Sequence, residues 1–303
     1  MLTIAAKKKH RGIKLNPVER VGMAVVYLIC IMAGILTIVP FLYIVAGSFA
    51  TEKELVERAF FIIPHTFSLN AYKYIIADGS IFRGLANSFF IMIAGKVVNM
   101  AFTTTLAYPL SKSNLKGRNV VLNVIIVTML FSGGMIPNYL VVKGLGLLDS
   151  YWALMLPGAV NAFNLIVKNF FQELPHELEE AARIDGCSDV GIFAKIILPL
   201  SKPALASVGL FYAVSHWNDF FNSLIYLNST EKFPVQIILR QIVLLAQGAS
   251  ADGSAVDFGV GGTPPEQVVK MAATVVATIP ILCVYPFVQK YFEQGVMVGA
   301  VKG

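Results

Sequence analysis

The sequence predicts an all-α membrane protein with six transmembrane helices. Its 303 residues are 56% hydrophobic and only 14% charged, and the mean hydropathy is +0.69. An ordinary soluble domain carries about 25% charged residues. The hydrophobic residues also form long blocks, each of which can supply the roughly 20 residues that cross a bilayer. The expected spans are 22–48, 84–110, 120–142, 152–171, 203–227 and 271–290.

The first span follows a strongly basic N-terminal tail, residues 1–20. After this tail the chain carries no charged residue from Val21 to Ala50. The hydrophobic part of a secretory signal peptide has only about 7–15 residues. The long uncharged run is therefore expected to be a retained membrane helix, the first element of a transmembrane domain that covers residues 21–294.

The later spans are less uniform. The second contains Lys96, which either faces a polar path or extends its amine to the membrane surface. The third is interrupted by Gly133, Gly134 and Pro137. Such residues are tolerated in membrane helices where other groups satisfy the backbone. Residues 131–140 are therefore either a kinked helix end near the outer surface or part of a polar path through the membrane.

The orientation follows from lysine and arginine residues in short loops, which remain in the cytoplasm. The N-terminal tail is basic, and the second connection holds Lys112, Lys116 and Arg118 with no acidic residue. Both are expected on the cytoplasmic side. The connection 172–202 and the C-terminal tail, residues 295–303, then lie on the same side, so that both termini are cytoplasmic.

The outer side receives the connection 49–83 and the longest loop, residues 228–268. Glycine and serine are frequent in the second half of this loop. Segments of this composition behave as flexible chains. The loop is therefore expected to be mobile.

Missing motifs exclude several function classes. The chain has no GxxxxGK[ST] sequence for phosphate binding and no HExxH zinc motif. Its three cysteines form no CxxC pair, and its four histidines are scattered. The net charge is +6, and the basic residues lie beside hydrophobic blocks rather than along a stripe that fits nucleic acid. The chain is therefore expected to be no enzyme, to bind no metal or cofactor, and to bind no nucleic acid.

The long acidic connection before the fifth span begins like a helix. Pro175 suits a first helical turn. The acids Glu177, Glu179 and Glu180 favour the positively polarised N-terminal end of a helix. Gly186 can adopt a positive φ and end the helix there.

A second helix is expected directly afterwards, with Ser188 as its N-cap and Pro199 and Pro203 at its end. Helical spacing gives each helix one apolar side. The residues on that side are Leu174, Leu178, Ala181, Ala182 and Asp185 for the first helix, and Val190, Phe193, Ala194 and Ile197 for the second.

Six carboxylates gather in this connection, at Glu173, Glu177, Glu179, Glu180, Asp185 and Asp189. They form either a solvated helix face or a docking surface for another protein. An acid–base pair is not expected, because no neighbour would desolvate one carboxylate and raise its pKa.

The same connection resembles a known family. The sequence EAARIDGCSDVGIFAKIILP, residues 180–199, is similar to the EAA loop of the membrane subunits of binding-protein-dependent ABC importers. The segments LPHELEEAARIDG and SHWNDFFNSLIYL and the ending GAVKG resemble the carbohydrate-type permeases, especially the second membrane subunit of maltose and lipoprotein-like oligosaccharide importers. The residues that carry the ATPase-coupling motif are Glu180, Ala181, Ala182, Asp185, Gly186, Ile196, Leu198 and Pro199.

This resemblance implies a type I importer permease fold in a bacterial cytoplasmic (inner) membrane, with a coupling helix in the EAA loop. It implies a homologous second permease, two cytoplasmic ATPase subunits that bind ATP and Mg, and an extracytoplasmic sugar-binding protein that delivers an oligosaccharide. The chain itself would bind no ATP. In some relatives the C-terminal tail reaches the ATPase dimer. The matching residues here are Gly295, Gly299, Lys302 and Gly303.

The fifth span holds the most polar cluster of any span, residues 216–219. A charge near the middle of a bilayer costs at least about 2.5–3.5 kcal/mol, so it usually faces protein or water. Trp217, Asn218 and Asp219 therefore either line a sugar path or have a structural role at a helix end or between subunits. In a path, the indole would stack on a sugar and the polar groups would bond its hydroxyls.

Two other functions stay open. One is an ABC permease for amino acids or peptides, which the WND segment and the GAVKG ending disfavour. The other is a secondary transporter or channel that needs no ATPase. Co-purification of the chain with an ATPase would separate these classes.

Overall fold

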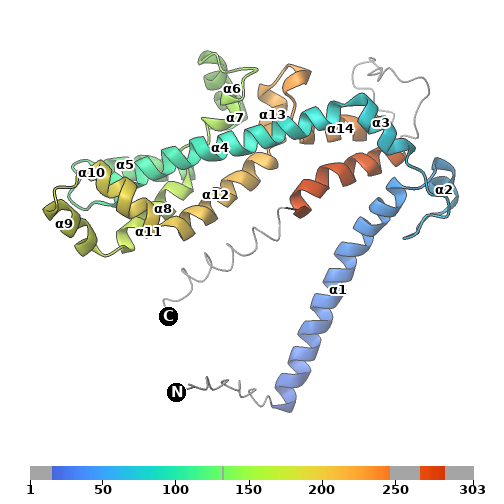
Figure 1. Ribbon diagram of the computed structural model, residues 1–303, viewed down its shortest axis with the longest axis horizontal. Helices are drawn as coiled ribbons and strands as arrows, with labels where there is room; N and C mark the ends of the chain where they lie inside the picture. Colours follow the sequence, from blue (N-terminus) through green and yellow to red (C-terminus); the bar gives the residue numbers. More distant parts are fainter. Residues whose placement is uncertain (1–15, 132, 246–266, 284–303) are drawn as a thin grey trace, which may run out of the picture.

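The computed structural model describes residues 16–131, 133–245 and 267–283, and all regular elements in these ranges are helical (Figure 1). The all-α prediction is therefore confirmed for the described part of the chain. The expected C-terminal tail, residues 295–303, and most of the basic N-terminal tail lie outside it.

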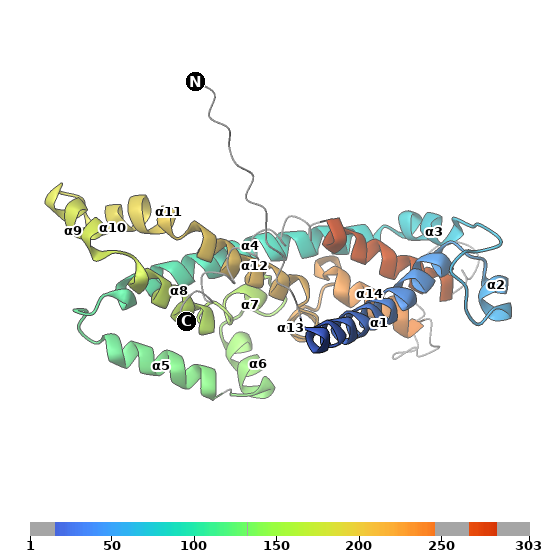
Figure 2. The ribbon, with the colours of Figure 1, turned by 90° about the horizontal axis from the view of Figure 1, so that it is seen from below.

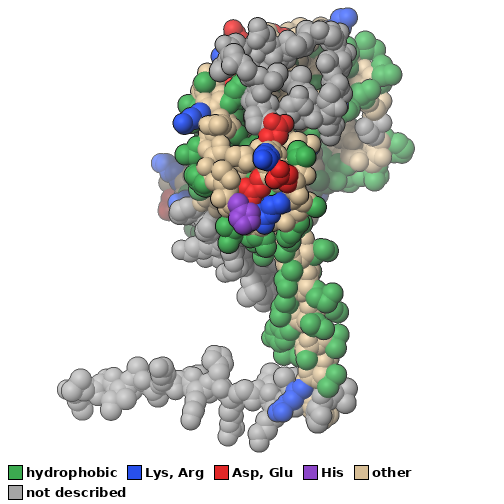
Figure 3. Space-filling model, turned by 90° about the vertical axis from the view of Figure 1, so that its right-hand side faces the viewer, with side chains coloured by type: hydrophobic (Ala, Val, Ile, Leu, Met, Phe, Trp, Pro, Cys, Tyr) green, Lys and Arg blue, Asp and Glu red, His purple; other side chains and the backbone are tan. Residues whose placement is uncertain are grey.

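The first helix, α1, spans Pro17–Ser48 and leaves the rest of the molecule as a separate rod (Figure 1). Figure 3 shows it as a column of hydrophobic side chains. Its 32 residues exceed the roughly 20 that a membrane helix needs. The helix agrees with the first expected span, residues 22–48.

The centre of the packed body is α4, Ser80–Ser111, which also has 32 residues. It agrees with the second expected span, residues 84–110. Figures 1 and 2 show it running along the long axis of the molecule. The helices packed against it are α3 (Asn70–Asp78), α7 (Trp152–Met155), α8 (Ala162–Glu173), α12 (Lys202–Trp217) and α14 (Val235–Leu245).

α4 and α12 approach closely because Gly95 has no side chain. A Cβ atom at Gly95 would lie 2.5 Å from Nε2 of His216, a rigid ring held on α12. At Gly209 of α12 a Cβ atom would meet only the flexible end of Lys96, at 2.9 Å from its Cε. The crossing of these two helices therefore depends on a glycine at position 95.

Two helices in the described ranges are long and apolar enough to cross a membrane, namely α1 and α4. A third candidate is bent by 82° between residues 189–200 and 202–217. The remaining expected spans do not form single long helices within the described residues. Helix length alone therefore leaves the number of six spans as a prediction.

Each of the broken spans is interrupted by residues that disfavour a continuous helix. The expected span 120–142 is divided into α5 (Arg118–Leu130) and α6 (Met135–Gly144), with the break at Gly133 and Gly134. The expected span 152–171 is divided into α7 and α8, where Asn161 caps α8 by accepting from the amide of Phe163 at 2.8 Å.

The expected span 203–227 is divided into α12 and α13 (Phe221–Tyr226). The break lies at the polar residues Asn218 and Asp219. A carboxylate oxygen of Asp219 accepts from the backbone amide of Asn222 at 3.2 Å, so the side chain helps to start the new helix.

The first part of the connection 228–268, which is expected to be a mobile outer loop, forms helices. Residues 230–232 form a 3₁₀ turn, and α14 follows over Val235–Leu245. Val235 and Ile237 are fully buried, and the amide of Val235 donates to Oγ of Ser88 in α4 at 2.9 Å. This amphipathic segment packs against α4. Residues 246–266, which contain the Gly/Ser-rich stretch, lie outside the described residues.

The last described helix covers Gln267–Cys283. It begins four residues before the expected span 271–290 and is well packed, since Ala272 and Ala273 are fully buried. The remainder of that expected span lies outside the described residues.

An ionic clasp joins the turn before α7 to the segment before α14. The carboxylate of Asp149 accepts from Nζ of Lys232 at 2.8 Å, from Oγ and the amide of Ser229 at 2.6 and 2.9 Å, and from the amide of Asn228 at 3.0 Å. These donors, Lys232 first, hold the pKa of Asp149 well below its usual range. The clasp lies on the side that the sequence assigns to the outside.

Candidate functional site

The acidic connection folds into a helical hairpin at one end of the molecule. It consists of α9 (His176–Ile184), α10 (Asp189–Ile192), the π-helical turn η1 (Phe193–Ile197) and α11 (Leu198–Leu200). We refer to residues 176–200 as the tip hairpin. Figures 1 and 2 place it at the opposite end of α4 from α2 (Glu52–Glu57) and α3.

The first helix of the tip hairpin ends as expected, at Gly186. This residue has φ +79°, a backbone conformation that side chains with a Cβ rarely adopt. The amide of Gly186 donates to the carbonyl of Arg183 at 3.0 Å, and that of Cys187 to Ala182 at 2.9 Å. These two bonds form a Schellman motif. Pro175 precedes the helix as its N-cap, one position earlier than predicted.

The second helix begins as predicted, because Oγ of Ser188 accepts from the amide of Gly191 at 3.2 Å. It also ends close to the predicted place, at Leu200, between Pro199 and Pro203. Pro199 lies in the short last helix α11, and Pro203 lies in the first turn of α12. Proline cannot donate the usual helical hydrogen bond. The helix contains a widened π turn directly before Pro199 and changes direction only at Ser201.

The predicted apolar sides of the two helices are confirmed in part. Ala182 and Ile197 are buried, and Leu174 and Phe193 pack against the same core, whereas the other predicted residues are exposed. In α9 the buried residues are Glu179 and Ala182, and in the second helix they are Ile192 and Ile197. The π turn changes the helical register between the last two, which a pattern of 3.6 residues per turn misses. The exposed large apolar residues of the hairpin are Leu178, Ile184, Val190 and Leu200, and Ile184 and Val190 are 86% and 75% exposed.

The tip hairpin brings the coupling-motif residues into one small region. Only Ala182 among them is buried, and it packs beneath the turn. Ile196 and Leu198 are half-buried. The exposed motif residues are Glu180, Ala181, Asp185, Gly186 and Pro199. The turn at Gly186 therefore presents small and acidic residues beside two exposed apolar side chains.

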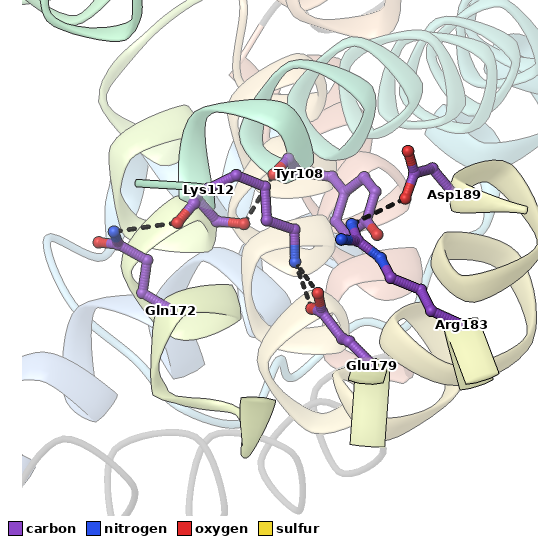
Figure 4. A network of polar contacts seen from close by, with 7 residues as sticks. Tyr108, Lys112, Gln172, Glu179, Arg183 and Asp189 are labelled. Carbon is purple, nitrogen blue, oxygen red and sulfur yellow. Dashed lines mark hydrogen bonds and ion pairs between the residues drawn. The ribbon is translucent and has the colours of Figure 1, made fainter. Parts of the chain in front are cut away.

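One acid of this hairpin is not solvated. Glu179 is 8% exposed, and both of its carboxylate oxygens accept from Nζ of Lys112, at the end of α4 (Figure 4). The ammonium group of Lys112 also lies 4.6 Å from the ring centroid of Tyr108. The idea of a uniformly solvated acidic face is thus wrong at Glu179. The sequence indicates this pair only through the presence of Lys112 in the basic connection between the second and third expected spans.

A cavity of about 620 Å³, lined by both polar and apolar residues, lies where α4, α6, α7, α8, α12 and α13 meet. Its polar lining consists mainly of amide and hydroxyl side chains, which both donate and accept hydrogen bonds. The polar lining residues are Asn99, Asn138, Asn161, Tyr212, Ser215, His216, Asp219, Asn222 and Tyr226.

Several of these side chains hold one another. Nδ2 of Asn99 lies 3.2 Å from Nε2 of His216, which joins α4 to α12. The hydroxyl of Tyr212 lies 2.7 Å from Oγ1 of Thr103 and donates to Oδ1 of Asn161 at 3.0 Å. One wall of the cavity is therefore a preorganised network across three helices.

The polar cluster of residues 216–219 is divided between this cavity and the core. His216 and Asp219 line the cavity. Trp217 is 5% exposed and packs edge-to-face on Phe89 of α4 with ring centroids 5.1 Å apart. Neither Trp217 nor the exposed Asn218 is among the lining residues. Of the three candidate pathway residues, only Asp219 lines this cavity.

The C-terminal candidates Gly295, Gly299, Lys302 and Gly303 lie outside the described residues. No group of three or more metal-ligating side chains occurs in the described ranges.

Comparison with known proteins decides the family. Residues 18–298 match the family described as binding-protein-dependent transport system inner membrane component. The chain belongs to this family. It is a permease, a non-enzymatic inner-membrane component of a transport system that depends on a binding protein. This confirms the resemblance drawn from the EAA loop, and the secondary transporter or channel is ruled out.

Two relatives from Bacillus subtilis (strain 168) are similar to this permease along most of its length. Protein LplC is 57% identical over 271 residues, which cover 89% of this chain and 91% of that protein. The polygalacturonan/rhamnogalacturonan transport system permease protein YtcP is 52% identical, covering 92% and 97%. A third relative, the arabinooligosaccharides transport system permease protein AraQ from Halalkalibacterium halodurans, is 31% identical, covering 88% and 92%.

A solved structure shares the fold. It is described as a bacterial ABC transporter involved in the import of the acidic polysaccharide alginate, and one of its chains matches this permease with a TM-score of 0.83 and 32% identity. The match covers 92% of this chain and 99% of that chain. The helical architecture is thus that of an ABC importer permease.

Proposed function

We propose that this permease forms one half of the membrane pore of an ATP-driven importer for oligosaccharides. YtcP is a permease of a polygalacturonan/rhamnogalacturonan transport system, AraQ is one of an arabinooligosaccharide transport system, and the solved structure belongs to an importer of alginate. The cavity supports the same substrate class, because its amides and hydroxyls can exchange hydrogen bonds with sugar hydroxyls. An amino acid or peptide would instead call for a fixed charge partner for each charged end.

The other half of the pore would be a homologous second permease. The surface of α1 supports this, since its apolar window has no buried residue within the described chain. We propose that lipid and the second permease together cover this helix. An extracytoplasmic sugar-binding protein would deliver the substrate at the opposite end from the tip hairpin.

The observation that carries the coupling role is the exposed turn at Gly186. Gly186 has no side chain, so another protein can approach the backbone of this turn closely. The exposed apolar residues Ile184 and Val190 flank it and fit a groove on such a partner. We propose that two cytoplasmic ATPase subunits, which hold ATP and Mg, dock at this turn and its counterpart on the second permease. The tails of residues 295–303 would contribute to the same interface.

The proposed topology has six spans and cytoplasmic termini. Single cysteines at Ser68 and Ser113 test it, in a chain whose three native cysteines are replaced by serine. An impermeant thiol reagent on intact cells should label position 68, which follows α2, and spare position 113, which follows α4. The reverse labelling would contradict this orientation.

Gly186→Asp tests the coupling role. The side chain would strain the turn at φ +79° and add bulk and charge where a partner must approach, although nothing within 4 Å in this chain obstructs it. In a reconstituted complex, sugar uptake and substrate-stimulated ATP hydrolysis should fall together, by about tenfold or more. Membrane insertion should be normal.

Gly117→Asp is the matched control. Gly117 has φ +83°, nothing within 4 Å of its Cβ position, and a place in the other cytoplasmic connection. The same strain and charge there should leave coupling near the wild-type level. Wild-type uptake and ATP hydrolysis in Gly186→Asp would reject the coupling role.

A further inference from the structure

We propose that the Lys112–Glu179 ion pair is the rigid link through which the tip hairpin moves α4. This inference rests on the proposed coupling function. It assigns a role to two residues outside the EAA motif, and the role is to position α4 rather than to contact ATPase or sugar.

The pair joins two elements that are far apart in the sequence. Lys112 is the C-cap residue of α4, and Glu179 lies in the first turn of α9. The side chains are only 19% and 11% exposed. Both carboxylate oxygens accept from the same ammonium group. A shielded, two-point contact of this kind is screened little by water or salt.

Helix polarity strengthens the pair at both ends. A cation is favourable at the C-terminal end of a helix and an anion at the N-terminal end. Lys112 and Glu179 satisfy both preferences where α4 ends and α9 begins. The charges would be less favourable in the opposite order.

Further contacts close around the last turn of α4 (Figure 4). The ring of Tyr108, one turn before Lys112, lies 4.9 Å from that of Phe193 in η1. Nε2 of Gln172 in α8 donates to the carbonyl of Ser111 at 3.1 Å. The end of α4 is therefore held by three other elements, which favours movement as one body.

α4 extends from this link to the cavity. Asn99, which lines the cavity and contacts His216, lies about 20 Å from Lys112 along the same helix at a rise of ~1.5 Å per residue. A displacement of α9 would thus reach the cavity wall through one rigid element.

Two other ion pairs in the described ranges are local and exposed. Lys53–Glu57 lies within α2, with side chains 81% and 61% exposed. Arg183–Asp189 lies within the tip hairpin and is 52% and 73% exposed. Exposed pairs contribute little. The Lys53–Glu57 pair provides a control with the same residue types.

The test uses the complete reconstituted complex with its ATPases, second permease and binding protein. The variants are Lys112→Glu, Glu179→Lys, the double exchange of both, the neutral Glu179→Gln, and the double exchange at Lys53 and Glu57. The measured quantity is ATP hydrolysed per sugar transported, together with the yield of assembled complex.

Each single charge reversal should raise ATP consumption per sugar by about threefold to tenfold. The double exchange of Lys112 and Glu179 should lower this ratio again, part of the way to the wild-type value. The recovery should be incomplete because the exchanged charges oppose the helix dipoles. The exchange at Lys53 and Glu57 should behave like the wild type. If a charge reversal prevents assembly, Glu179→Gln keeps the shape of the side chain and should still raise the ratio.

A wild-type ratio in assembled Glu179→Gln and in either charge reversal would overturn the link, as would a double exchange no better than the single variants. These outcomes differ from failure of the proposed function. That failure would show as an absence of ATP-driven sugar uptake in the wild-type complex itself.

Discussion

α1 and α4 have the same length of 32 residues but opposite surroundings. No residue in the apolar window of α1 is buried, whereas 28% of the corresponding window of α4 is buried. Leu36 in α1 is 77% exposed, while Ile91 in α4 is 1% exposed. The more apolar helix is the less buried one, so the described part of the chain does not supply its surroundings.

The buried side of α4 also contains polar residues, in contrast to the apolar surface of α1. Ser88, Asn99 and Thr103 are nearly inaccessible, and each makes a hydrogen bond to another segment. Buried polar groups are stable when paired and help to fix one arrangement of helices. α1 is therefore a surface for lipid or another subunit, and α4 is the frame on which the cavity and the tip hairpin are built.

The largest expected effect comes from Trp217→Ala. This residue packs on α4 through Phe89, so its removal should cost about 3–5 kcal/mol and lower the Tm of the isolated permease in detergent. Tyr27→Ala on α1, where the ring is 62% exposed, should change the Tm little. Uptake per assembled complex should be unchanged in Trp217→Ala. Full stability with an altered sugar preference would contradict the packing role and restore the stacking hypothesis.

A smaller effect is expected at the α4–α12 crossing. Gly95→Ala places a methyl group 2.5 Å from the ring of His216 and should destabilise the fold by about 1–3 kcal/mol. Gly34→Ala on α1 meets nothing within 4 Å and improves helix propensity. Thermal unfolding of the two variants should therefore shift in opposite directions. An equal shift would mean that α1 is packed as tightly as α4.

The smallest effect concerns acid pH and the Asp149 clasp, which belongs to the packed body. The folded-state pKa of Asp149 lies below its ordinary value of 3.8. Its contribution to stability is therefore present above that value and is lost as the pH falls through the folded-state pKa. Asp149→Asn should lower the Tm at pH 7 and flatten the loss of Tm on acidification below about pH 4.

The nearby exposed acid Glu231 provides the control for this prediction. Glu231→Gln should keep both the Tm at pH 7 and the acid-induced loss. A parallel pH profile for wild type and Asp149→Asn would show that the clasp adds nothing to stability.

The sequence predicted the elements that depend on local signals. The long apolar runs gave α1 and α4 within a few residues, and the capping residues Ser188 and Gly186 placed the turn of the tip hairpin. These features depend on residues that are close in the sequence, so the spacing of those residues is sufficient to predict them. The family motif added the coupling role, which no local pattern contains.

The sequence failed where distant segments decide the structure. The burial of Glu179 depends on Lys112, and the burial of Trp217 depends on Phe89, two contacts across the fold. The π turn before Pro199 changed which residues face inward. The helix α14 is not expected from the sequence, because its 11 residues are too few for a membrane span and it packs on the distant Ser88 of α4.

The distance between the end of α4 and the start of α9 tests the central claim, that the tip hairpin and α4 move as one body. Spin labels at Ser113→Cys and His176→Cys, in a chain whose native cysteines are replaced by serine, report it without touching the ion pair. If the two elements move together, the labels should give one narrow distance distribution that is the same in nucleotide-free complex and in complex with trapped ATP. A shift of more than about 5 Å, one helical turn, in samples with retained ATP would contradict this joint movement.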